Sequence, residues 1–119
     1  MRRVQVLNST RSAVLASRAE VARTIWQRGI GLLGRGDWSR ADGLVITHCN
    51  SIHCLFMSLP IDVAFVRRDG RVARLAPDVR PWSIGPFVLS ADYVVELPVG
   101  TLEQTGTKVN DQLQLVEAD

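Results

Sequence analysis

The segment "IDVAFVRRDGRVARLA", residues 61–76, constrains the fold of this chain more than any other stretch. Its first five residues alternate with the two-residue period of a β-strand. This period places Ile61, Val63 and Phe65 on one side, and Asp62 and Ala64 on the other. Asp69 and Gly70 then form a turn signal, in which the glycine supplies the required positive φ, and Val72 begins a return strand. The middle of the chain is therefore predicted to be a β-hairpin.

Other stretches rich in branched and aromatic residues predict further strands, with turn signals between them. These strands cover residues 4–7, 13–16, 43–49, 51–57, 91–100 and 112–116. In the stretch that begins at residue 91, the alternation places Tyr93, Val95 and Leu97 on one face, and Val94 and Glu96 on the other. Three prolines predict that residues 76–87 form an irregular loop, because proline lacks a backbone donor and disfavours helix before it.

Helical signals occur twice. Thr24 followed by Gln27 has the spacing of a capping box, which predicts a helix of about nine residues that ends near Gly34. Thr101 followed by Gln104 repeats this spacing over one short turn, which Gly106 would close.

The composition fits one globular domain over residues 1–119. No apolar run is long enough to span a bilayer, and polar residues interrupt the N-terminal segment, so we expect no membrane association and a cytoplasmic location. The net charge of +2 comes almost wholly from arginine, with Lys108 the only lysine, and acidic residues are interspersed along most of the chain. Nucleic acid is therefore not an expected partner.

Several motifs together resemble the DUF192 family, also called UPF0127. They are "GLLGR" at residues 31–35, Met57 followed by Pro60, Ile61 and Asp62, "YVVELPVGT" at 93–101, and "TGTKVNDQLQL" at 105–115. Leu33 stands where the family usually has methionine, and Asn110 where it has glycine. The resemblance implies a mainly β fold, a compact single-domain β-barrel or sandwich with one short α-helix, and it implies no reaction.

Both cysteines and both histidines lie within residues 48–54. In a continuous strand, Cys49 and His53 would lie about 13 Å apart and Cys49 and Cys54 about 16 Å apart, too far for a shared metal ion or a disulfide without a bend at Asn50 and Ser51. Cys49 could act as a nucleophile with a histidine as base. The simpler interpretation makes the cysteines small core residues and His53 a hydrogen-bonded strand residue.

Asp62 and Glu96 each interrupt an apolar strand, so each either faces solvent or is buried and then paired or protonated. If their strands are neighbours, the two carboxyl groups could share a face and perform acid/base chemistry, although a structural role is commoner. Trp82, with Arg80 and Trp38, could form one wall of a ligand groove, or Trp82 could plug the end of a barrel.

These observations favour a binding module without a catalytic residue, metal or cofactor, whose partner is an unidentified small polar ligand or a protein. The candidate pocket residues are Cys49, His53, Asp62, Trp82 and Glu96. One alternative is a metal- or thiol-dependent enzyme centred on Cys49 and His53. Another is an assembly module that pairs through an exposed strand edge.

Overall fold

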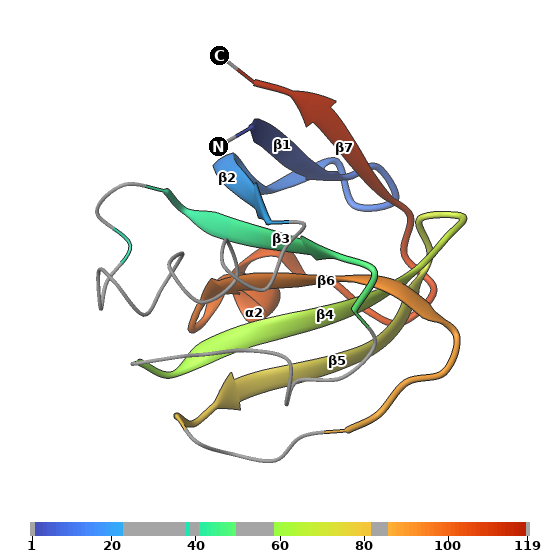
Figure 1. Ribbon diagram of the computed structural model, residues 1–119. Helices are drawn as coiled ribbons and strands as arrows, with labels where there is room; N and C mark the ends of the chain where they lie inside the picture. Colours follow the sequence, from blue (N-terminus) through green and yellow to red (C-terminus); the bar gives the residue numbers. More distant parts are fainter. Residues whose placement is uncertain (1, 23–37, 39–40, 50–58, 82–85, 119) are drawn as a thin grey trace.

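The computed structural model describes residues 2–22, 38, 41–49, 59–81 and 86–118, which form one curled sheet and a short helix (Figure 1). The elements are β1 (Arg3–Asn8), β2 (Ala13–Ala22), β3 (Gly43–Thr47), β4 (Ile61–Arg67), β5 (Val72–Val79), β6 (Ala91–Pro98), α2 (Thr101–Thr105) and β7 (Leu113–Glu117). The strand order is β5-β4-β6-β3-β2-β1-β7. Neighbouring strands are antiparallel except β2 and β3, which are parallel.

The two edge strands meet at one corner, where the β4–β5 turn reaches the start of β7. The Leu113 amide donates to the Gly70 carbonyl at 2.8 Å, and the Val72 amide donates to the Asp111 carbonyl at 2.9 Å. Gly70 has a φ of 88°, as the turn signal predicts, and a Cβ atom there would lie 2.7 Å from the Leu113 carbonyl oxygen. The sheet is thus a partly closed barrel, which confirms the predicted mainly β fold.

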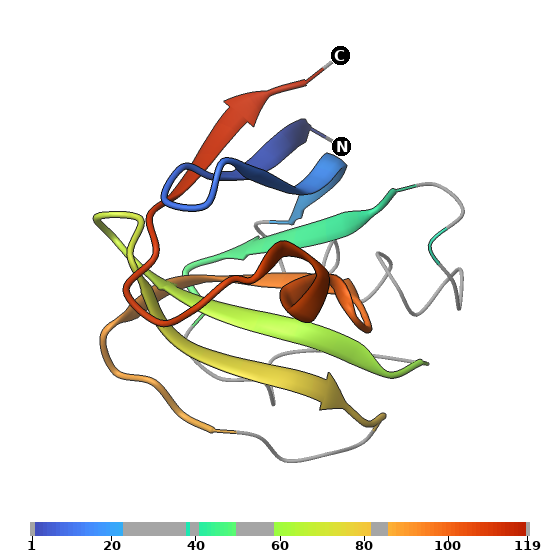
Figure 2. The same ribbon diagram turned by 180° about the vertical axis from the view of Figure 1, so that it is seen from behind.

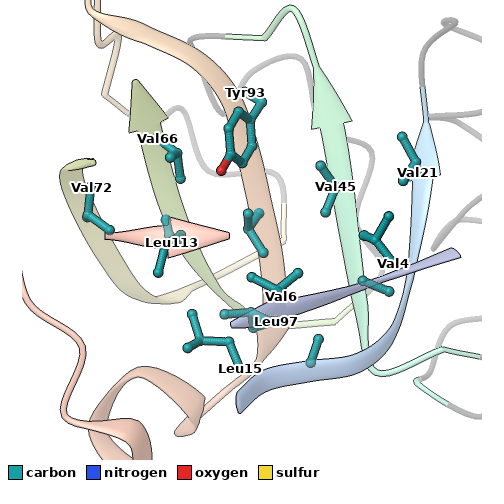
Figure 3. Close-up of a cluster of buried hydrophobic side chains, with 14 of the residues drawn as sticks. Val4, Val6, Leu15, Val21, Val45, Val66, Val72, Tyr93, Leu97 and Leu113 are labelled. Carbon is teal, nitrogen blue, oxygen red and sulfur yellow. The ribbon is translucent and has the colours of Figure 1, made fainter. Parts of the chain in front are cut away.

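The concave side of the sheet encloses the larger of the two apolar clusters that the described residues form (Figure 3). This inner cluster draws on every described strand and on the helix through Leu102. Its members are Val4, Val6, Leu15, Ala16, Ala19, Val21, Val45, Ala64, Val66, Val72, Tyr93, Val95, Leu97, Leu102 and Leu113. Each large aliphatic side chain removed from water contributes about 1.5–3 kcal/mol, so this cluster is the main source of stability on that side.

A second apolar cluster, the outer cluster, lies on the opposite face of the sheet. It comprises Ala22, Leu44, Ile46, Cys49, Ile61, Val63, Phe65, Val79 and Val94. The predicted alternation is confirmed on both strands. On β4, Ile61, Val63 and Phe65 belong to the outer cluster and Ala64 to the inner one. On β6, Val94 belongs to the outer cluster, whereas Tyr93, Val95 and Leu97 belong to the inner one. Strands β4 and β6 are therefore apolar on both faces.

Several predicted boundaries are wrong. The strand predicted over residues 13–16 extends to Ala22, and the strand predicted over residues 91–100 ends at Pro98. Residues 76–79 were predicted as loop but continue β5, because Pro77 lies on an edge strand where no neighbour needs its missing N–H, and Asp78, at a φ of 51°, accommodates an irregularity there. The strand predicted over 43–49 ends at Thr47, because His48 adopts a left-handed φ of 56°. The chain therefore bends at His48, before Cys49.

The predicted capping box at Thr101 is also wrong. The residue before the helix is Gly100, with a φ of 97°, and its position has no side-chain cap. The Thr101 hydroxyl instead donates to the Pro98 carbonyl at 2.7 Å. Gly106 does end the helix, at a φ of 67°, as predicted.

The predicted helix from Thr24 and the predicted strand over residues 51–57 lie outside the described residues. Within the part of the chain that the structure covers, no helix is long and apolar enough to cross a membrane.

Candidate functional site

Asp62 is a buried carboxylate that joins three segments of the fold. Its Oδ2 accepts hydrogen bonds from the amides of Gly100 and Leu102, both at 3.1 Å, at the start of α2. Its Oδ1 accepts the Asp78 amide at 2.9 Å, at the irregularity in β5. The carboxylate thus accepts hydrogen bonds from backbone N–H groups that have no backbone acceptor at the helix start and at the irregularity in the edge strand. This arrangement gives Asp62 a structural role.

Glu96 differs from Asp62 in having a side-chain oxygen without a partner. Its side chain is 1% exposed, and its direct cross-strand neighbours are Leu44 on β3 and Val63 on β4. Oε1 is buried and accepts no hydrogen bond from any residue that the structure describes. Burial raises the pKa of Glu96 from 4.5 to about 8, since an apolar environment disfavours the charged form. At neutral pH the side chain is therefore mainly a carboxylic acid, which can donate one hydrogen bond and accept others.

The strands of Asp62 and Glu96 are neighbours, but the two carboxyl groups do not share a face. Asp62 pairs with Leu97 and Val63 pairs with Glu96, and consecutive residues of a strand point to opposite sides of the sheet. Asp62 therefore lies on the inner face and Glu96 on the outer face. The alternative of an acid/base pair is therefore not formed, and Asp62 has the structural role that the sequence favoured.

Cys49 belongs to the outer cluster and is 3% exposed. Its amide donates to the Asp92 carbonyl at 3.3 Å. Asp92 lies four residues before Glu96 on β6, which separates Cys49 from Glu96 by about 13 Å along the sheet. Such burial is typical of a structural cysteine rather than of a reactive nucleophile.

Two further candidates, His53 and Trp82, lie outside the described residues, so their relation to Cys49 and Glu96 stays a prediction. Among the residues whose positions are described, no three His, Cys, Asp or Glu side chains come together as a possible ion site. Of the five residues predicted to line a pocket, the three described ones, Cys49, Asp62 and Glu96, lie at separate places in the sheet. A pocket that also involves His53 and Trp82 stays a prediction.

Trp38, like Arg3 and Arg67, also has a buried polar atom without a partner among the described residues. Its ring is partly buried against the outer cluster, and its indole Nε1 is buried without a hydrogen bond. The outer cluster therefore carries two unsatisfied groups, the Glu96 carboxyl and the Trp38 N–H.

A polar network at the tip of the β1–β2 hairpin was missed by sequence reasoning. The buried Asn8 amide donates from Nδ2 to Thr107 Oγ1 at 3.1 Å and to Asp111 Oδ2 at 3.0 Å. Arg11 donates to both oxygens of Asp111, at 2.9 and 3.2 Å, and these bonds, with those from Asn8 and the Lys108 amide, lower the pKa of Asp111 to about 2. The only signal in the sequence was the turn cluster "NSTR" at residues 8–11, which does not reveal a partner 100 residues away.

Comparison with known proteins decides the family, since the model for DUF192, "Uncharacterized ACR, COG1430", matches residues 6–115. The chain belongs to the DUF192 family. It is 30% identical over 112 residues to a UPF0127 protein of Thermococcus sibiricus, covering 91% of this chain and 72% of that protein. A UPF0127 protein of Pyrococcus abyssi is 27% identical over 114 residues, covering 93% and 97%. The crystal structure of a protein of unknown function from Novosphingobium aromaticivorans has the same fold, with a TM-score of 0.72 and 24% identity over 94% of this chain and 83% of that one.

This DUF192 protein shows how a departure from the family pattern is accommodated. Asn110, which replaces the usual glycine, has a φ of 74°, and asparagine tolerates this left-handed conformation better than most residues. Its amide donates to the Val72 carbonyl at 2.8 Å. The corner between β5 and β7 is therefore kept despite the substitution.

Proposed function

We propose that this DUF192 protein is a non-catalytic binding module that holds a small molecule against Glu96 on the outer face of its sheet. The observation that carries the proposal is the Glu96 carboxyl group, which is 1% exposed and has an oxygen without a hydrogen-bond partner. A polar group left in this condition costs about 1–3 kcal/mol. A ligand that completes its hydrogen bonding would offset that cost.

Trp38, whose ring packs against the outer cluster, offers a second polar group on that side of the sheet. Its Nε1 is the second buried donor without a partner on the outer cluster. A carboxylic acid and an indole N–H can both donate to oxygen, so the expected ligand is a neutral molecule with an apolar body and at least one carbonyl or hydroxyl oxygen. Apolar walls with few polar groups are typical of small-molecule sites.

Among the described residues no second carboxyl group lies beside Glu96, which favours binding over acid/base catalysis. Its cross-strand neighbours Leu44 and Val63 are apolar, and Asp62 lies on the other face. We propose the cytoplasm as the compartment, because a chain with only two cysteines fits a reducing environment.

A thermal-shift screen tests the proposal. The wild-type protein, Glu96→Leu and the exposed-site control Glu103→Gln would be heated with a panel of small neutral amides, ketones, lactones and alcohols. We expect compounds that stabilise the wild type and the control by about 2–3 kcal/mol at a hundredfold excess over Kd, and that leave Glu96→Leu unchanged. The proposal fails if no compound stabilises the wild type, or if the same compounds stabilise Glu96→Leu equally.

A further inference from the structure

A groove of about 360 Å³ runs between the edge strand β5 and helix α2, on the side of the sheet opposite Glu96 (Figure 2 shows the helix in front of the sheet). It is lined by Leu75, Pro77, Leu102, Glu103, Gly106, Thr107 and Lys108. A Cβ atom built on Gly106 would meet nothing within 4 Å, so the groove is open at that point. Its volume lies at the lower end of the range for small-ligand sites.

The backbone of Leu75 presents an unused donor and acceptor to this groove. The Arg67 amide donates to the Arg71 carbonyl, so Arg67 and every second residue before it, including Phe65, direct their backbone groups at β5. Phe65 pairs with Arg74 and Ala64 pairs with Leu75, which makes Leu75 a residue whose N–H and C=O point away from β4. Val72, opposite Val66, has the same orientation, and its outward groups do bond to Asp111 and Asn110.

Only a short stretch of the β5 edge around Leu75 is open to pairing with another strand. Towards Val72 the edge is occupied by the C-terminal segment, and Pro77 offers no N–H two residues further on. No described residue bonds to the outward groups of Leu75. One extended residue of a partner can therefore pair with Leu75, but a long strand cannot.

The rim of the groove carries one charge of each sign. Glu103 lies on α2, Lys108 follows the helix, and both side chains are exposed. The described structure gives neither of them an ion pair. The floor between them is apolar, through Leu75, Pro77 and Leu102.

We propose that the groove between β5 and α2 binds a short extended peptide segment, whose central apolar residue pairs with the Leu75 backbone. A basic residue on one side of it would meet Glu103, and an acidic residue on the other side would meet Lys108. The partner is therefore a peptide segment with an apolar residue between opposite charges. This site is independent of the Glu96 site.

Two blocked tripeptides, Ac-Lys-Val-Glu-NH2 and Ac-Glu-Val-Lys-NH2, test the proposal in titrations of the ¹⁵N-labelled full chain followed by NMR. We expect one of them to shift the Leu75 amide signal at millimolar concentration, with roughly threefold preference over the other because exposed ion pairs are weak. The double variant Glu103→Lys with Lys108→Glu, which changes only exposed positions, should reverse this preference. N-methylation of the central valine should abolish binding, since it removes the N–H that pairs with the Leu75 carbonyl.

These measurements distinguish binding through backbone hydrogen bonds to Leu75 from other modes of peptide binding. The proposal is overturned if neither peptide shifts the Leu75 amide, if the charge-exchanged variant keeps the wild-type preference, or if the N-methylated peptide binds equally well. Glu96→Gln should bind the tripeptide like the wild type, so failure at one site leaves the other proposal standing.

Discussion

Asp62 and Glu96 lie on adjacent strands one residue apart in register, yet their side chains point to opposite faces of the sheet. On the inner face Asp62 accepts three backbone hydrogen bonds. On the outer face Glu96 keeps an oxygen without a partner. One carboxyl group therefore holds three segments of the fold together, while the other keeps an oxygen that no described residue bonds.

Replacement of Asp62 by asparagine should destabilise the protein by about 2–3 kcal/mol, because one charged acceptor serves the amides of Gly100, Leu102 and Asp78. Urea unfolding at pH 7 measures the change. Asp78→Asn is the matched control, since it makes the same chemical change at an exposed residue, and it should alter stability by less than about 0.5 kcal/mol. Equal effects of the two substitutions would contradict the structural role of Asp62.

The stability of the protein should fall as the pH rises from about 4.5 to about 8. The pKa of Glu96 is about 8 in the folded state against 4.5 ordinarily, so over this window the folded state retains a proton that the unfolded state loses. Each pH unit in the window costs up to about 1.4 kcal/mol. Glu96→Gln should flatten this profile, whereas Glu103→Gln should leave its slope as in the wild type. A wild-type profile that is already flat would rule out the raised pKa.

The contribution of the Asp111 network to stability should have the opposite pH dependence, falling as the pH is lowered into the acidic range. The lowered pKa of Asp111, about 2, means that its stabilising effect is complete above its ordinary value of 3.8 and is lost as the pH falls through 2. Arg11→Met removes the largest cause of the lowering, so acid unfolding should begin at a higher pH, as followed by circular dichroism. Arg68→Met, at an exposed arginine of the hairpin tip, is the control and should leave the acid midpoint in place.

Alanine substitutions at Gly70 and Gly106 together test the backbone contact that closes the sheet. Both glycines have positive φ values, 88° and 67°, so alanine at either position pays the left-handed penalty of about 1–2 kcal/mol. Only at Gly70 would the new Cβ meet backbone, 2.7 Å from the Leu113 carbonyl oxygen. Gly70→Ala should therefore be clearly more destabilising than Gly106→Ala in denaturant unfolding. Similar losses of stability in the two variants would show that the corner between β4, β5 and β7 relaxes to accommodate the new Cβ atom, and would contradict the predicted clash.

Local patterns in the sequence predicted the elements that depend on local interactions. The hairpin turn at Asp69 and Gly70 and the alternation in β6 required only neighbouring residues. The start of α2 did not follow from Thr101, because its acceptor comes from Asp62, 38 to 40 residues away on another strand. The opposite orientation of Asp62 and Glu96 depends on the register between β4 and β6, which no local pattern specifies.

Asn110 and Asn8 illustrate the same limit at the corner of the sheet. The left-handed φ of Asn110 is compatible with its residue type, but the sequence does not indicate which asparagine adopts it. Asn8 contacts Thr107 and Asp111 about 100 residues away, so its burial follows from the topology alone.

The unfolding free energy of Glu96→Leu relative to the wild type, measured at pH 8 without ligand, tests the central claim most directly. If the carboxyl group has no internal partner and is retained for binding, an apolar side chain of similar size should leave the protein equally stable or more stable, by up to a few kcal/mol. A loss of about 3 kcal/mol or more would mean that Glu96 is held by an internal partner, and would contradict its assignment as a ligand contact.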